Sequence, residues 1–154
     1  MLLAPVLNVA HKEVLLPVDN GILTLAARED LFNVVIVKKG LKYIIVTEIG
    51  YMELGNKVGI FFCPGEFDPS IIFGGPESGD AAWTGETWDY APLKDVADVE
   101  CVMVYGLCND QAGYVLRDNE YHSLLSENEE VNVVSKTAGA NFTEAYIELI
   151  NDVK

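Results

Sequence analysis

Two apolar segments of this sequence each lead into a short polar motif, and these motifs hold the residues best suited to chemistry. Residues 58–63 run into Pro64-Gly65-Glu66, and residues 99–105 lead into a Gly-containing segment that ends at Tyr114. In α/β folds, ligands bind at the carboxyl ends of strands, where turns present polar side chains. A carboxylate in such a position can serve as a metal ligand or as a general base. Glu66 and Tyr114 are therefore the first candidate site residues.

Both residues also have a purely structural interpretation. Glu66 would stabilise a helix that starts at this point, because a carboxylate near a helix N-terminus interacts favourably with the helix dipole, by about 0.3–1 kcal/mol. Tyr114 would be a packing residue whose hydroxyl finds a hydrogen-bond partner. A third alternative is a self-contained acid–base hydrolase that uses Glu66 with Asp68 or Glu77, and only proximity in the sequence supports it.

The familiar catalytic motifs are missing from the sequence. Its two histidines, His11 and His122, lie in polar surroundings typical of surface residues. They form no His-x-His or Cys/His cluster, so the chain cannot build an ordinary zinc site from its own nitrogen and sulfur ligands. It also lacks the Gly-x-Ser-x-Gly nucleophile motif and the Gly-x-x-x-x-Gly-Lys-Ser/Thr phosphate loop.

Composition indicates a single globular domain over residues 1–154, since half of the residues are apolar. The net charge of −14 argues against nucleic acid and anionic membranes as partners. No segment reaches the ~20 apolar residues of a transmembrane span, and no basic region of a signal peptide is present. We therefore expect a cytoplasmic protein. Cys63, Cys101 and Cys108 lie in or beside apolar runs, which predicts reduced cysteines in the core.

The pattern of apolar and β-branched residues predicts strands and helices that together make an α/β (α+β) fold. Strands are expected over residues 6–17, 33–37, 42–49 and 58–63, a buried strand over 99–105 and a short one over 131–134. Short turns join the second, third and fourth of these strands, which predicts an antiparallel meander. We expect a mixed, largely antiparallel sheet packed with helices.

The clearest helix is expected at the C-terminal end, over residues 141–153. Asn141 would be its N-cap and Glu144 would complete a capping box. Its apolar residues recur at a spacing of three or four and form one face, as in an amphipathic helix packed on a core. Residues 67–73 are a candidate for a single helical turn with Pro69 near its start. The pattern over 22–30 is ambiguous, with a short helix as one option, and a short helix is also an option over 119–125.

Residues 74–90 read as one long loop that is rich in glycine and holds Trp83 and Trp88. Long loops within compact domains are usually functional or disordered. The two tryptophans are therefore candidates for a loop that covers a substrate cleft. Alternatively they anchor the loop to the body of the protein, because tryptophan is usually largely buried.

Several of these motifs, taken in order, resemble the later part of the neutral/alkaline non-lysosomal ceramidase-type hydrolases. The resemblance rests on Thr47-Glu48-Ile49, on Pro64-Gly65-Glu66-Phe67, and on Gly106-Leu107-Cys108-Asn109 with Tyr114. It continues through Tyr121 to the small residues Thr137-Ala138-Gly139-Ala140, and it covers roughly residues 12 to 150. Where the family has a further active-site Tyr followed by Glu, this chain reads Ser126-Glu127.

The resemblance implies that Glu66 and Tyr114 are zinc ligands. The family's other ligands are histidines from an earlier part of the catalytic domain, and this chain has no counterpart to them. The chain would then be the C-terminal portion of a larger catalytic domain, inactive alone. In the complete enzyme, zinc would activate water for attack on the amide carbonyl of an N-acyl lipid such as ceramide.

The missing part of the site defines the expected partners. Either the upstream half of the catalytic domain or a second copy of this chain in a homodimer would complete it, and exposed apolar surface would mark the contact. The alternative is a non-catalytic binding or assembly module of the same ancestry. The departure at Ser126 and the extended loop with Trp83 and Trp88 favour that alternative.

Overall fold

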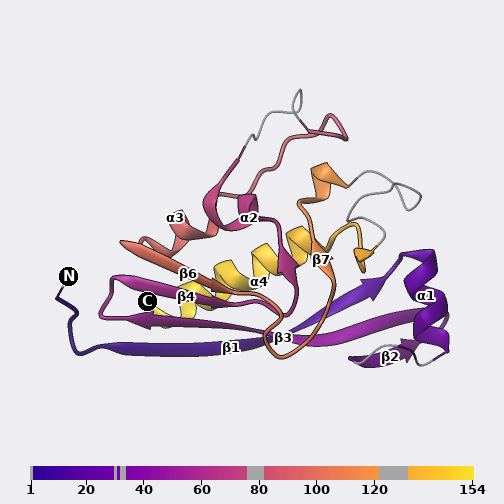
Figure 1. Cartoon of the computed structure of the whole chain (residues 1–154), viewed down its shortest axis with the longest axis horizontal. Helices are drawn as coiled ribbons and strands as arrows, with labels where there is room; N and C mark the ends of the chain where they lie inside the picture. The colour runs from indigo at the N-terminus through magenta and orange to yellow at the C-terminus, as the bar shows by residue number, and fades with distance from the viewer. Residues whose placement is uncertain (1, 30, 32–33, 76–81, 122–131) are drawn as a thin grey trace.

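A mixed five-stranded sheet forms the centre of the protein (Figure 1). The computed structural model describes residues 2–29, 31, 34–75, 82–121 and 132–154. The sheet has the order β1-β3-β4-β6, and β2 also pairs with β3. Its strands are β1 (Leu7–Val18), β2 (Val35–Lys39), β3 (Lys42–Leu54), β4 (Val58–Phe62) and β6 (Cys101–Tyr105). Helices accompany this sheet, so the predicted α+β class with a largely antiparallel sheet is confirmed.

The long strand β3 organises the sheet. β1 pairs with it antiparallel along nearly its whole length, from Leu7 opposite Leu54 to Val18 opposite Tyr43. β2 and β4 pair antiparallel with opposite ends of β3. The turns at Gly40 and Gly55 join these three strands, and both glycines have the positive φ that tight turns require. The predicted meander is therefore confirmed.

β6 lies beside β4 and runs parallel to it. The prediction that this apolar segment is a buried strand is wrong, because Met103, Val104 and Tyr105 are between 37% and 46% exposed. Cys101 is exposed as well, and Cys108 is only partly buried, so Cys63 alone is a core cysteine. An apolar run has the same pattern in a central strand and in a strand with one paired neighbour, so the sequence could not distinguish them.

Four helices and one 3₁₀ turn complete the described structure. They are α1 (Gly21–Arg28), α2 (Pro69–Phe73), α3 (Leu93–Ala97), η1 (Asp118–Glu120) and α4 (Ala138–Val153). The C-terminal helix α4 packs along β1 and β3 (Figure 1). Its predicted apolar face is confirmed: Phe142, Tyr146 and Ile150 are fully buried. Among the described residues, none of the helices has the length and apolar character needed to cross a membrane.

The start of α4 differs from the prediction. The helix begins at Ala138 with Thr137 as N-cap, so the predicted capping box at Asn141 and Glu144 is wrong. Asp118, from η1, accepts a hydrogen bond from the backbone N–H of Ala140 at 3.1 Å. The acceptor for the first turn thus comes from a distant segment, which a local sequence pattern cannot reveal.

The shorter elements agree in part with the sequence. α1 forms where a short helix was one option, and the Asn20 side chain accepts hydrogen bonds from its first turn. The helical turn predicted over 67–73 forms as α2, but it starts later than predicted, at Pro69, with Asp68 as its N-cap. α3 was not predicted, and η1 covers only the start of the expected helix over 119–125, whose residues 122–125 lie outside the described residues. Near the predicted strand 131–134, Val133 forms isolated bridges with Gly113 and Tyr114.

Candidate functional site

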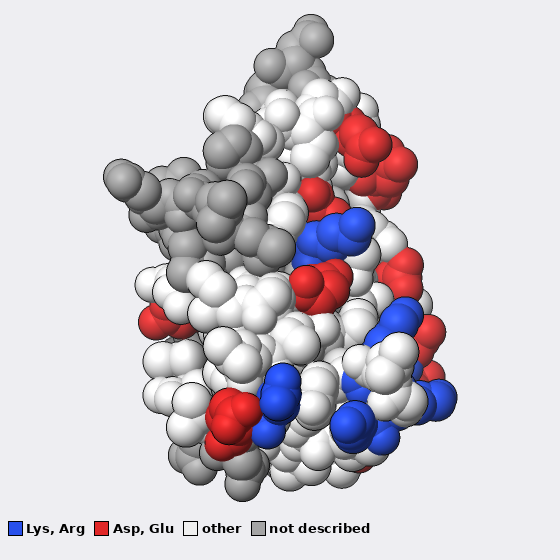
Figure 2. Space-filling view, turned by 90° about the vertical axis from the view of Figure 1, so that its right-hand side faces the viewer, with Lys and Arg blue, Asp and Glu red and all other residues white. Residues whose placement is uncertain are grey.

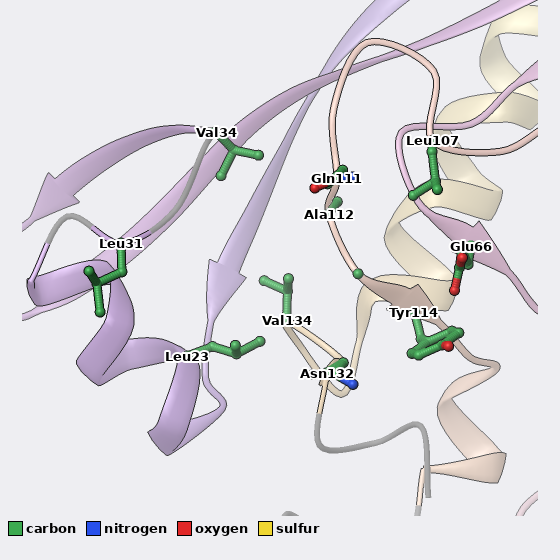
Figure 3. Close-up of a pocket in the computed structure, with 11 residues that line it drawn as sticks. Leu23, Leu31, Val34, Glu66, Leu107, Gln111, Ala112, Tyr114, Asn132 and Val134 are labelled. Carbon is green, nitrogen blue, oxygen red and sulfur yellow. The ribbon is translucent and has the colours of Figure 1, made fainter.

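The fold brings Glu66 and Tyr114 together. The short strands β5 (Glu66–Phe67) and β7 (Tyr114–Val115) form a parallel ladder in which Glu66 lies directly opposite Tyr114. Directly opposed residues of a ladder project to the same face. Figure 3 shows the two side chains next to each other at the rim of a pocket. Two residues singled out separately in the sequence thus form one pair.

Backbone contacts fix the turn that carries Glu66. The N–H of Glu66 donates to the carbonyl of Gly113 at 3.0 Å, and the N–H of Asp68 donates to Val115 at 2.9 Å. A Cβ atom on Gly65 would lie 2.5 Å from the carbonyl oxygen of Gly113. Only glycine therefore allows the two segments to approach closely enough for this ladder.

The segment before Tyr114 is held in a similar way. The N–H of Ala112 donates to Pro64 at 2.8 Å, and the hydroxyl of Thr47 donates to the Asp110 carboxylate at 2.6 Å. Thr47 is buried in β3, so this bond ties the loop to the central sheet. Sequence reasoning noticed Thr47 as part of a motif but missed Asp110. Its place in the Gly-containing segment that leads to Tyr114 was the only available signal.

Two open hollows share the Glu66–Tyr114 pair. The larger, of about 430 Å³, also has an apolar wall that includes Leu23, Val34 and Val134 (Figure 3). The smaller, of about 360 Å³, is lined by the pair together with Phe67, Asp68, Pro69 and Leu116. The pair therefore forms an oxygen-rich ridge that both hollows share.

The charges around the pair are acidic. Within the described part of the chain, no Lys or Arg lines either hollow. Basic side chains gather instead on the lower part of the face in Figure 2, the end of the molecule that holds α1 and β2. Lys38, Lys39 and Lys42 belong to that end, at the turn between β2 and β3. The ridge is thus suited to a cation or a hydrogen-bond donor rather than to an anion.

Glu66 and Tyr114 do not by themselves make a complete zinc site. In the residues that the structure describes, no group of three or more His, Cys, Asp and Glu side chains is placed to hold a metal ion. His11 lies on β1, is largely exposed and pairs with Glu48 at 3.2 Å, and His122 is outside the described residues. Zinc sites in proteins have three or four protein ligands, usually with nitrogen or sulfur among them. Glu66 and Tyr114 fit part of such a site only.

Two other roles were considered for Glu66: a residue that stabilises the start of a helix, and an acid–base partner of Asp68 or Glu77. Asp68, not Glu66, is the N-cap of α2, and its carboxylate accepts the N–H of Ser70 at 2.8 Å. The interpretation of Glu66 as a helix-start residue is therefore wrong. Asp68 is also engaged in capping, which argues against its service as an acid–base partner, and Glu77 lies outside the described residues.

The two tryptophans separate into different roles. Trp88 is buried and its ring packs on Tyr90, with ring centroids 4.8 Å apart, so it anchors the loop. Trp83 is 63% exposed. Neither side chain lines the two hollows beside Glu66 and Tyr114. Their predicted role as substrate-loop residues stays a prediction.

The comparisons with known proteins give structural neighbours only. No protein family and no curated protein matches the chain. A solved structure of neutral ceramidase from Pseudomonas aeruginosa has a TM-score of 0.48 and 18% identity, over 69% of this chain and 15% of that one. A ceramidase complexed with C2 has a TM-score of 0.46 and 16% identity, over 68% and 14%. The match thus spans a small part of each ceramidase, and at this level it bears on neither activity nor substrate.

Proposed function

We propose that this chain is the C-terminal portion of a ceramidase-like, zinc-dependent lipid-amide hydrolase, to which Glu66 and Tyr114 contribute part of the metal site. An upstream segment or a second copy would supply the nitrogen ligands. One observation carries the proposal: the two motif residues, which lie far apart in the sequence, are opposed in one ladder and share two hollows.

The chemistry of the pair supports this assignment. Carboxylate and phenolate oxygens are accepted zinc ligands when nitrogen ligands complete the sphere. A zinc ion held there would supply an activated water and polarise an amide carbonyl. This chain's own part is to hold the two oxygens in place, through the close contact at Gly65 and the bond between Thr47 and Asp110. The apolar wall with Leu23 and Val34 would suit an acyl chain.

Zinc titration followed by backbone amide NMR tests the partial site. With only two oxygen ligands we expect weak binding, with a Kd of roughly 0.1–1 mM. Shift changes should cluster at residues 65–67 and 113–116 and should vanish in Glu66→Ala. Glu86→Ala, which removes an exposed carboxylate elsewhere, should leave them unchanged. Zinc-dependent shifts that persist in Glu66→Ala would contradict the proposal.

An assay on a fluorescent N-acyl sphingoid amide distinguishes the two sources of the nitrogen ligands. If an upstream segment supplies them, the isolated chain with zinc should hydrolyse the amide no faster than zinc alone. Hydrolysis that a chelator abolishes and that rises with chain concentration would show that a second copy completes the site, and hydrolysis by the monomer would show that the proposal of a partial site is wrong.

The alternative function is a binding or assembly module that has lost catalysis. It is favoured by the lack of a third metal ligand among the described residues and by the departure at Ser126. If the amides of residues 65–67 and 113–116 do not respond to zinc at any concentration, this alternative replaces the proposal above.

A further inference from the structure

Two cysteines meet where the strand before Glu66 and the loop before Tyr114 come together. The N–H of Cys108 donates to the carbonyl of Cys63 at 2.8 Å. The covalent bonds on either side of this hydrogen bond keep the two Cα atoms at most about 6.7 Å apart. Disulfides span Cα distances of about 4.4–6.8 Å. The hydrogen bond therefore keeps the backbones of Cys63 and Cys108 within reach of a disulfide bond.

The side chains share one environment. The Cys63 thiol is fully buried and lies 3.3 Å from the Tyr146 hydroxyl. A charge on Cys108 contributes to the raised pKa values of both Cys63 and Tyr146, after the larger effect of burial. Cys108 itself is only partly buried, so a small molecule in solution can reach it.

The turn around Cys108 holds it against Cys63. Its two neighbours, Leu107 and Asn109, have φ values of 55° and 71°. Left-handed backbone is uncommon for residues other than glycine and persists only where surrounding contacts fix it. The hydrogen bonds from Leu107 to Gly65 and from Cys108 to Cys63 are such contacts. The approach of the two cysteines is therefore built into the loop.

We propose that Cys63 and Cys108 are a site of reversible oxidation, at which exchange with a low-molecular-weight disulfide forms an internal disulfide bond. The inference does not rest on the proposed metal site and applies to the chain without zinc. Its consequence concerns the same place, since the bond would lock the turn that carries Glu66 to the loop that leads to Tyr114.

The exchange proceeds in two steps. The Cys108 thiolate attacks one sulfur of the small disulfide, which forms a mixed disulfide and releases one thiolate. The sulfur of Cys63 then attacks the sulfur of Cys108 and releases the second small thiol, which takes the proton of Cys63. The two cysteines are oxidised, and the small disulfide is reduced to two thiols.

The two thiols are suited to different steps. Burial raises the pKa of the Cys63 thiol to about 12, and the nearby Cys108 adds to this, while the bond to Tyr146 opposes it. Cys63 is therefore a poor first nucleophile, and Cys108 makes the first attack. The second step should be slow and should accelerate as the pH rises.

Oxidation with excess oxidised glutathione, followed by alkylation and peptide mass spectrometry, tests the proposal. We expect a peptide pair joined through Cys63 and Cys108, and glutathione or the alkylating agent on the exposed Cys101. The control Cys101→Ser should still form the bond, and Cys108→Ser should not. Oxidation should raise the thermal midpoint by roughly 5–15 °C, and dithiothreitol should reverse it.

Other outcomes would overturn the proposal. Glutathione that stays on Cys108 while Cys63 keeps a free thiol would show that the sulfurs cannot join. A disulfide from Cys101 to either cysteine, within the chain or between copies, in place of the bond between Cys63 and Cys108 would also overturn the proposal. Cys108→Ser replaces a partly exposed side chain, so the test does not depend on a variant of the buried Cys63.

Discussion

Two regions of this molecule, the hydrophobic core and the β5–β7 ladder, are held together in opposite ways. In the core between the central sheet and α4, large side chains fill the space: Phe61 packs on Tyr51 and Tyr146 with ring centroids 5.1 and 5.3 Å apart. The β5–β7 ladder has two residues in each strand, and Glu66 on it is exposed. Backbone hydrogen bonds and close contacts at glycines maintain the ladder.

The side chains of the core and those of the ladder therefore contribute differently to the stability of the fold. Side-chain burial gives the core most of its free energy, so its residues are constrained by volume. The ladder depends on backbone geometry, so the exposed side chain of Glu66 is not needed to hold it together. Substitutions in the two regions should therefore differ in size and in kind.

The largest effect should follow from a cavity in the core. Phe61→Ala removes a fully buried ring and should lower the free energy of unfolding by about 3–5 kcal/mol. Urea denaturation followed by circular dichroism measures it. Leu25→Ala, at a side chain that is 58% exposed, should cost less than about 1 kcal/mol. Equal losses at the two positions would show that the rings around Phe61 do not dominate stability.

A backbone contact should give the next largest effect. In Gly113→Ala the new Cβ would lie 2.2 Å from the carbonyl oxygen of Asn132, at a φ of +75°. We expect a loss of roughly 2–3 kcal/mol, from strain and from displacement of β7. Gly40→Ala has a similar φ of +65° with nothing within 4 Å, and it should cost only about 1 kcal/mol. The same denaturation experiment compares them, and equal costs would rule out the contact with Asn132 as the cause.

Asp118 joins the two regions, since it follows β7 and caps the first turn of α4. Burial raises the pKa of its carboxyl to about 6, with smaller contributions from Glu144 and Asp19, while the bond from Ala140 lowers it. The folded state then holds the proton more tightly than the unfolded state, so this group's contribution to stability is lost as the pH rises through about 6.

Asp118→Asn should remove that dependence. Between pH 4 and pH 7 the variant should gain about 1–2 kcal/mol relative to the wild type, a figure reduced for the partial exposure of the carboxyl. Urea denaturation at several pH values measures the difference. A constant difference across this range would show that Asp118 titrates as it does in the unfolded chain.

Features that depend on side-chain burial could be predicted from the sequence, and features that depend on contacts between distant segments could not. The strands around Ile45 and Phe61 and the apolar face of α4 follow from periodicity, because burial imposes it. The position of β6 beside β4 does not follow, since an apolar run is the same whether one or both of its neighbours are present. The N-terminus of α4 could not be predicted either, because its acceptor, Asp118, comes from another segment.

For the site, the candidate residues could be predicted from the sequence, but their arrangement in space could not. Glu66 and Tyr114 were identified from motifs at strand ends, and nothing in their spacing indicates that they are opposed in one ladder. That register depends on the contact between Gly65 and Gly113, which is a property of two backbones in space. The bond between Thr47 and Asp110 joins distant segments in the same way.

The smallest effect on stability should come from Glu66, and a neighbouring carboxylate offers the matched control. Glu66→Ala should change the free energy of unfolding by less than about 0.5 kcal/mol, because the side chain is exposed and the ladder bonds of Glu66 use only its backbone. Asp68→Ala should cost about 1 kcal/mol, because it removes the cap of α2. Urea denaturation of both variants measures the contrast. If Glu66→Ala costs as much as Asp68→Ala, the Glu66 carboxylate has a structural role, and the ladder no longer separates from the core as a region kept for binding.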